Sequence, residues 1–218
     1  MSLTLSGPIA PPLAGGRPSS LVVLLHGVGA DGRDLINLVR FWASLLPNTE
    51  FVAPNAPGPS DVTPSGRQWF SVKDPTPGMV SAGASATAPI LDRFLDEVLA
   101  SRGLDESRLA LVGFSQGTMM SLHVGPRRAR PLAGVLGFSG ALTNPDRLAA
   151  EIRSRPPVLL IHGEADEIVP FSMMAAAEAA LKANAVNVET MACPGLGHTV
   201  GGAGLRRCGA FLKRVLDT

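Results

Sequence analysis

Short apolar runs alternate with stretches of helical spacing along this chain of 218 residues. The runs are rich in β-branched and aliphatic residues, and several are continuously hydrophobic, which is typical of strands buried on both faces. We expect six strands, over residues 21–25, 51–53, 108–112, 134–138, 158–162 and 186–191. This alternation predicts an α/β fold, with a mostly parallel central sheet and helices on both of its faces.

Two segments carry the clearest helical periodicity. Between Pro89 and Gly103, apolar side chains recur three or four positions apart, and the proline suits a first helical turn while the glycine suits the end. Residues 205–216 repeat the pattern. No internal repeat or low-complexity linker divides the chain, so we expect one domain over residues 1–218, with residues 1–20 as an N-terminal extension.

Glycine and proline are the unusual part of the composition. The chain holds 24 glycines and 19 prolines, well above their average combined share of about 12%, which indicates a folded protein rich in tight turns. Six of the prolines fall within residues 54–77. We expect a proline-rich loop over residues 54–80, and so long a loop in a compact domain is usually functional or mobile.

The charge balance excludes several classes of protein. Nineteen basic and 18 acidic side chains give a net charge of +1, which argues against binding to nucleic acid or to an anionic membrane. The one basic cluster, Arg127, Arg128 and Arg130, lies among glycine and proline and is interpreted as a solvated loop. Two cysteines alone, Cys193 and Cys208, define neither a disulfide framework nor a zinc site, so we expect free thiols.

The N-terminal residues lack the features of a secretory signal, and no apolar run approaches the length of a transmembrane helix. We therefore expect a cytoplasmic protein without stable membrane insertion.

The segment Gly113-Phe114-Ser115-Gln116-Gly117 follows an expected strand and opens a short helical pattern. In that context, G-x-S-x-G forms a sharp strand-to-helix turn that lifts the serine hydroxyl above the sheet. A serine that only caps the helix is the plainer alternative. The strand before it and the helix after it favour Ser115 as a nucleophile.

A serine nucleophile needs a histidine base, which in this chain order lies downstream. His123 lies two turns along the helix that begins after Ser115, too far along to reach the turn. His162 ends a strand, and we expect it to close a turn with Gly163. His198 follows the last strand in a glycine-rich loop that can reach over the sheet edge, so His198 is the predicted base.

The base in turn needs an orienting carboxylate. Glu164, Asp166 and Glu167 all follow the strand over residues 158–162, and spacing does not choose among them. A tetrahedral oxyanion also needs N–H donors, and the residue after His26-Gly27 can supply one beside that of Gln116.

The same glycine-rich turn satisfies G-x-G-x-x-G over residues 27–32, which suggests a dinucleotide site as a rival. That fingerprint needs an acidic residue at the end of the next strand, whereas Glu50 begins its strand. The histidines are scattered and no H-E-x-x-H occurs. We expect neither a cofactor nor a metal.

Five segments, in this order, resemble the α/β-hydrolase superfamily and, within it, the small carboxylesterase/phospholipase group that includes acyl-protein thioesterases. The resemblance spans about residues 20–216. Its most specific parts are Leu25-His26-Gly27-Val28-Gly29-Ala30-Asp31, Arg67-Gln68-Trp69-Phe70, Gly113-Phe114-Ser115-Gln116-Gly117, His162-Gly163-Glu164-Ala165-Asp166-Glu167-Ile168-Val169-Pro170 and Gly197-His198.

The resemblance implies an α/β-hydrolase fold without a large cap domain, and it places the proline-rich loop near the active site. It also chooses among the candidate carboxylates. The implied roles are nucleophile for Ser115, orienting acid for Asp166, base for His198, and backbone oxyanion donors for Val28 and Gln116. Trp69 would then lie near the substrate, or else pin the proline-rich loop to the core.

The function that these residues predict is a serine carboxylesterase that hydrolyses small-molecule esters through an acyl-enzyme, as a monomer or homodimer. An acyl-protein thioesterase or lysophospholipase would use the same residues. A nicotinamide-dependent oxidoreductase and a catalytically silent α/β-hydrolase receptor are the more remote alternatives, and receptors of that kind usually lack a triad member.

Overall fold

A computed structural model describes residues 5–217 of the chain. Residues 1–4, which begin the expected N-terminal extension, and residue 218 lie outside the described residues, and so do those two ends of the expected 1–218 domain.

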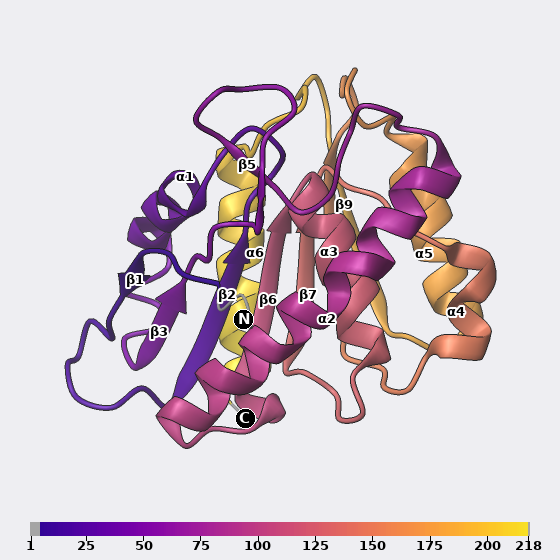
Figure 1. Cartoon of the computed structure of the whole chain (residues 1–218). Coiled ribbons are helices and arrows are strands. Elements are labelled where there is room, and N and C mark those ends of the chain that lie inside the picture. The colour runs from indigo at the N-terminus through magenta and orange to yellow at the C-terminus, as the bar shows by residue number, and fades with distance from the viewer. Residues whose placement is uncertain (1–4, 218) are drawn as a thin grey trace.

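Strands and helices alternate along the chain (Figure 1). The strands are β1 (Ile9–Ala10), β2 (Ser20–Leu25), β3 (Thr49–Val52), β4 (Gly58–Pro59), β5 (Arg67–Gln68), β6 (Leu109–Phe114), β7 (Gly134–Phe138), β8 (Val158–Gly163) and β9 (Val188–Cys193). The α-helices are α1 (Gly32–Ile36), α2 (Pro77–Arg102), α3 (Gln116–Val124), α4 (Pro145–Glu151), α5 (Ser172–Ala183) and α6 (Gly202–Leu216). Short 3-10 helices are η1 (Asn37–Phe41), η2 (Glu106–Arg108) and η3 (Gly125–Arg127).

Seven of the strands form one sheet in the order β1-β3-β2-β6-β7-β8-β9. All neighbours run parallel except β1, which pairs antiparallel with β3. The six strands expected from the sequence are all present, with ends shifted by no more than two residues. The predicted α/β class, with a mostly parallel sheet, is confirmed.

Helices cover both faces of this sheet, so the core has two halves (Figure 1). On one face, α2, α3, α4 and α5 pack on the sheet, and on the other face η1, α1 and α6 do so. Strand β2 is buried along its whole length because Leu21, Val23 and Leu25 face the first half and Val22 and Leu24 face the second. Continuous hydrophobicity is therefore what this strand requires.

Pro89 does not begin a helix, and the sequence prediction was wrong here. Helix α2 begins twelve residues earlier with Pro77 in its first turn, and it carries Pro89 in its interior. The helix continues through the proline because Ala84 and Leu91, on either side, are buried in the core, and Thr87 is tied by its hydroxyl to a backbone carbonyl. The end at Gly103 is as expected, because this glycine adopts the left-handed conformation of a helix C-cap.

Two predicted segment boundaries also differ from the structure. The proline-rich loop ends at residue 76, where α2 takes over, and it contains the short antiparallel pair β4 and β5. The described part of the expected N-terminal extension is joined to the sheet, because β1 pairs with β3. Neither short pairing has the apolar run by which a buried strand is recognised.

Arg128 is buried, so the interpretation of its cluster as a solvated loop was wrong for this residue. Its guanidinium bonds to Asp92 and, at 2.5 Å, to Asp96, both on α2. Burial opposes the charged form, but these carboxylates outweigh it and raise the pKa of Arg128. Arg127 is likewise paired, with Glu151 at 2.8 Å. Partners so distant in sequence cannot be seen from the cluster itself.

Parallel strands bring the chemically interesting loops to one edge. The turn after β2, the start of α3 after β6, and the loops after β8 and β9 all leave the carboxyl ends of their strands (Figure 1). Because Leu25 pairs with Gly113 and Gly163 pairs with Cys193, the loops fall into two adjacent pairs. Open α/β sheets bind ligands at this edge.

The start of α3 approaches the end of β2 more closely than any side chain allows. A Cβ atom on Gly117 would overlap the carbonyl group of Leu25, and one on Gly113 would overlap the backbone of Gly117. Glycine at these two positions therefore decides how close the serine turn lies to the turn after β2.

We expect Gly117→Ala to destabilise the protein by about 1–3 kcal/mol or more, because backbone atoms have to separate to admit the methyl group. Gly78→Ala is the matched control: it also lies near a helix start, but nothing lies within 4 Å of its Cβ position. The control should be neutral or stabilising by up to about 1 kcal/mol. Chemical unfolding of both variants tests this, and equal stabilities would contradict the close approach.

Candidate active site

Ser115 occupies a strained turn between β6 and α3. Its φ of 54° and ψ of −116° define a backbone conformation that residues other than glycine rarely adopt. Such a conformation costs on the order of 1–3 kcal/mol. The N–H of Ser115 donates to the carbonyl of Phe138 at 2.9 Å, and its own carbonyl accepts from Met119 at 3.2 Å. These bonds hold the turn on both sides and leave the serine at the carboxyl edge of the sheet.

His198 and Asp166 are hydrogen-bonded to each other. His198 Nδ1 lies 2.8 Å from Asp166 Oδ2 and 3.0 Å from Oδ1. Because the carboxylate accepts from Nδ1, the proton of the neutral imidazole is held there and Nε2 is left as the acceptor nitrogen. The other two candidate carboxylates, Glu164 and Glu167, point to solvent, so the structure brings only Asp166 of the three to this histidine.

The Asp166 carboxylate is fully occupied by donors. Besides His198, its Oδ1 accepts from the N–H groups of Ile168 at 3.0 Å and Val169 at 2.9 Å. Burial alone would raise the pKa of Asp166, but these hydrogen bonds outweigh it and the pKa is lowered. The carboxylate is therefore held ionised and in a fixed orientation.

His162 is a further partner of this carboxylate that the sequence reasoning missed. It was expected to close a turn with Gly163, but its buried Nε2 lies 2.9 Å from the carbonyl of Val169 and 3.2 Å from Asp166 Oδ2. Its ring also packs edge-on against Phe171. A histidine four residues before a candidate carboxylate, at a strand end, was the only signal in the sequence.

The ring of His198 lies against the serine turn. Its centroid is 4.9 Å from that of Phe114, the residue before Ser115. In the described residues no hydrogen bond joins Ser115 Oγ to His198. Catalytic hydrogen bonds are often long in the absence of substrate and tighten when substrate binds.

The turn over residues 26–30, here called the glycine-rich turn, lies beside Ser115. His26 is buried and holds the turn through both ring nitrogens: Nδ1–H donates to the carbonyl of Gly27 at 2.7 Å, and Nε2 accepts from the N–H of Ala56 at 3.0 Å. Burial lowers the pKa of His26, which keeps the ring neutral. Within residues 5–217, the N–H groups of Val28 and Gln116 donate to no protein acceptor.

Trp69 is only 2% exposed. Its indole N–H donates to the carbonyl of His26 at 2.9 Å, and its backbone carbonyl accepts from the hydroxyl of Thr87 at 2.7 Å. Of the two roles considered for Trp69, this environment favours the one that pins the proline-rich loop over the one that contacts substrate.

Comparisons with known proteins identify the family of this chain. A sequence profile described as phospholipase/carboxylesterase matches residues 14–216. The chain belongs to that family. The crystal structure of esterase PE8 is 44% identical, with a TM-score of 0.95 over 98% of this chain and 100% of that one. Acyl-protein thioesterase 1 of Gibberella zeae is 29% identical over 97% of both chains, and esterase YpfH of Escherichia coli is 28% identical over 83% of this chain and 76% of its own.

Membership of the phospholipase/carboxylesterase family confirms the resemblance stated from the sequence and the α/β-hydrolase fold without a large cap. Since the similar proteins are esterases and thioesterases, this family member is a hydrolase. No helix within residues 5–217 combines the length and the apolar character that a membrane span requires. Nor does that part of the chain contain a cluster of three or more side chains able to hold a metal ion.

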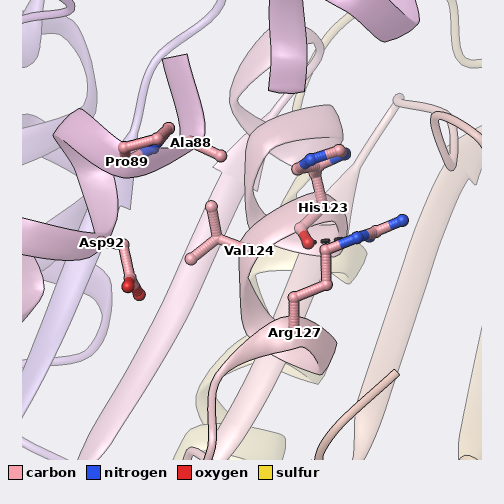
Figure 2. A pocket seen from close by; sticks show the side chains of 6 residues that line it. All are labelled: Ala88, Pro89, Asp92, His123, Val124 and Arg127. Atoms are coloured by element: carbon pink, nitrogen blue, oxygen red, sulfur yellow. Dashed lines mark hydrogen bonds between the residues drawn. The ribbon is translucent and has the colours of Figure 1, made fainter. Parts of the chain in front are cut away.

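A cavity of about 230 Å³ lies away from this site, between α2 and α3 (Figure 2). Ala88, Pro89 and Asp92 line it from α2, and His123, Val124 and Arg127 line it from the opposite side. Its volume is below the roughly 300 Å³ at which ligand pockets usually begin. His123, rejected as a base from its helical position, is buried here and bonds to Thr143 at 2.9 Å.

His123 should make the stability of this hydrolase sensitive to pH. Burial first, and then the charge of Arg127, lower its pKa to about 4 from an ordinary 6.5. Between pH 6.5 and about pH 4, His123 binds a proton in the unfolded chain but stays neutral in the folded chain. The contribution of neutral His123 to the unfolding free energy is therefore complete above about pH 6.5 and is lost as the pH falls toward 4.

We expect the unfolding free energy of the parent to fall over this range by up to roughly 3 kcal/mol more than that of His123→Gln, whose side chain does not titrate. Urea unfolding at several pH values measures the difference. His26 contributes to the same range in both proteins and cancels. Parallel curves for parent and variant would contradict the prediction.

Proposed function

We propose that this hydrolase is a serine carboxylesterase in which Ser115 is the nucleophile, His198 the base and Asp166 the orienting acid. The observation that carries the proposal is the His198–Asp166 hydrogen bond, at 2.8 Å, beside a serine held in a strained strand-to-helix turn. The exposed positions of Glu164 and Glu167 support Asp166 as the acid.

In the first half of the reaction, His198 Nε2 accepts the Ser115 proton while Oγ forms a bond to the ester carbonyl carbon. The carbonyl oxygen becomes an oxyanion. When the tetrahedral intermediate collapses, the carbon–oxygen bond to the alcohol breaks, and the leaving oxygen takes the proton from His198. An acyl group remains on Ser115.

In the second half, water attacks the acyl carbon as His198 accepts one of its protons. Collapse of the second intermediate breaks the bond to Oγ, which regains the proton from His198. The carboxylic acid departs and the enzyme is restored. Asp166 stabilises the imidazolium in both halves without taking the proton itself.

The proposed oxyanion donors are the N–H groups of Val28 and Gln116. Both are free of protein acceptors in the described chain, and both belong to segments at the same sheet edge as Ser115. The N-terminus of α3, which begins at Gln116, adds the positive end of its helix dipole. Each such donor is worth about 2.7–4 kcal/mol in hydrolases of this kind.

A thioester substrate fits the same residues, because the mechanism requires only an acyl carbonyl and a leaving group. The similarity to acyl-protein thioesterase 1 favours this second candidate. Values of kcat/KM measured side by side for chromogenic esters of increasing acyl length, a lysophospholipid and an S-acylated peptide would rank the three substrate classes.

The G-x-G-x-x-G segment over residues 27–32 does not support a nicotinamide site. A pyrophosphate cradle needs free backbone N–H groups, but that of Gly29 donates to Arg67 at 3.0 Å and that of Gly32 to the side chain of Asn55 at 2.9 Å. The cytoplasmic location and the monomeric or dimeric state stay predictions.

A fluorophosphonate probe should react covalently with Ser115, and peptide mapping should find the adduct on that residue. Ser115→Ala should be neither labelled nor active. Ser139, which also follows a strand and also has a positive φ, provides the control, because Ser139→Ala should still be labelled. An active parent that resists the probe would overturn the nucleophile assignment.

Asp166→Asn should lower kcat by about 10⁴-fold, because an amide that donates to Nδ1 stabilises the wrong imidazole tautomer. Glu164→Gln and Glu167→Gln serve as controls on the same loop and should change kcat little. Steady-state kinetics on one chromogenic ester compares the three variants. Full activity in Asp166→Asn, with loss in either control, would move the acid to that glutamate.

A further inference from the structure

The segment over residues 56–70, here called the strap, crosses the glycine-rich turn and is bonded to it at several points. The N–H of Gly29 donates to the carbonyl of Arg67 at 3.0 Å, and the N–H of Arg67 donates to the carbonyl of Ala30 at 2.8 Å. The hydroxyl of Thr63 donates to the carbonyl of Gly29 at 2.9 Å. The His26 contacts with Ala56 and Trp69 complete the connection. The strap therefore holds four polar backbone groups of this turn, namely the carbonyls of His26, Gly29 and Ala30 and the N–H of Gly29. It leaves the N–H of Val28 without a protein acceptor in the described residues.

The Gln116 side chain attaches the strap to the serine turn. Its Oε1 accepts from the N–H of Trp69 at 2.7 Å, and its Nε2–H donates to the carbonyl of Phe70 at 2.8 Å. The residue is 3% exposed, so both ends of the amide are used away from water, where lost hydrogen bonds are costly. Gln116 thus offers its backbone N–H to the site while its side chain holds the strap.

The connection continues from the strap to the Gly27–Val28 peptide. The Trp69 indole bonds to the carbonyl of His26, and the His26 ring bonds to the carbonyl of Gly27. In a planar trans peptide the C=O and the following N–H point in opposite directions. Holding the Gly27 carbonyl therefore also fixes the direction of the Val28 N–H.

We propose that Gln116 and Trp69 are positioning residues. Through the strap, the Gln116 carboxamide and the Trp69 indole hold the two oxyanion donors at a fixed distance and orientation relative to each other, here called their register. The inference rests on the proposed function, since it concerns the same oxyanion. One donor belongs to Gln116 itself, and the other belongs to Val28, at the far end of this hydrogen-bonded connection. Neither side chain has to touch the substrate to affect the reaction.

This arrangement predicts a specific kinetic signature. A displacement of about 1 Å between catalytic groups costs on the order of 100-fold in rate. Because the oxyanion forms only on the way to the transition state, losing the register should lower kcat and leave KM nearly unchanged. A strap that instead shaped the acyl pocket would change KM.

The direct test is Gln116→Met, which keeps the backbone N–H and the side-chain length but removes both hydrogen bonds of the carboxamide. We expect kcat to fall about 10- to 100-fold, with KM changed by less than about threefold. Trp69→Phe removes the indole donor and keeps an aromatic ring, and it should act in the same direction. It also keeps the test decisive if Gln116→Met does not fold.

The double variant separates a shared role from two independent ones. Because both residues act on the same connection, the double variant should have nearly the kcat of the worse single variant rather than the product of the two effects. Fully multiplicative losses would contradict positioning through the strap.

Thr49→Val is the matched control. It removes a buried hydrogen bond of 2.8 Å to Ser20, at the amino ends of β2 and β3 and thus away from the site. It should lower Tm without lowering kcat, so that loss of stability alone is distinguished from loss of register.

Ser115→Ala distinguishes failure of this inference from failure of the proposed function. If Ser115→Ala is inactive while Gln116→Met and Trp69→Phe keep kcat within about twofold of the parent, the positioning role is wrong and the serine mechanism stands. If Ser115→Ala retains activity, the mechanism and the positioning role fall together.

Discussion

The close approach of the first turn of α3 to the end of β2 is the contact on which the rest of the site depends. Gly117 lies against the carbonyl of Leu25, and Gly113 lies against the backbone of Gly117, with no room for a Cβ atom at either position. This approach forces the chain through a sharp reversal, and Ser115 takes the strained backbone conformation that results. It also places the start of α3, where Gln116 lies, beside the end of β2, from which the glycine-rich turn leaves.

The sheet order divides the chemistry into two halves around that contact. β2 and β6 are neighbours and lead into the glycine-rich turn and the serine turn, whereas β8 and β9 are neighbours and lead into the loops that carry Asp166 and His198, the proposed acid and base. Each half is stiffened in its own way. Hydrogen bonds from Ile168, Val169 and His198 hold Asp166, and the His162 ring lies beside it, while the strap holds the glycine-rich turn.

Much of the fold could be predicted because it depends on local pattern. The buried strands appear in the sequence as apolar runs, and the serine turn is recognised by Gly113 and Gly117, which lie two positions before and after Ser115. The pairing of His198 with Asp166 followed from chain order together with the family resemblance. These features repeat in any chain that builds the same sheet edge, so a single sequence is enough to suggest them.

The features that were missed depend on contacts between distant residues. Pro89 resembles a helix start, and only the packing around it keeps it inside α2. In the sequence Arg128 appears solvated, because the α2 carboxylates that it binds in the folded protein are distant along the chain. The contacts of Gln116 and Trp69 join side chains to backbone groups more than 40 residues away, and no periodicity or motif encodes such a pairing.

We infer above all that the close approach of α3 to the end of β2 assembles two backbone N–H donors beside a reactive serine. A crystal structure of the protein after reaction with a fluorophosphonate tests it most directly, because the phosphoryl oxygen occupies the place of the oxyanion. We expect phosphorus bonded to Ser115 Oγ, with the phosphoryl oxygen about 2.7–3.1 Å from the nitrogens of both Val28 and Gln116. An adduct on another residue, or an oxygen that faces solvent beyond reach of both N–H groups, would contradict it.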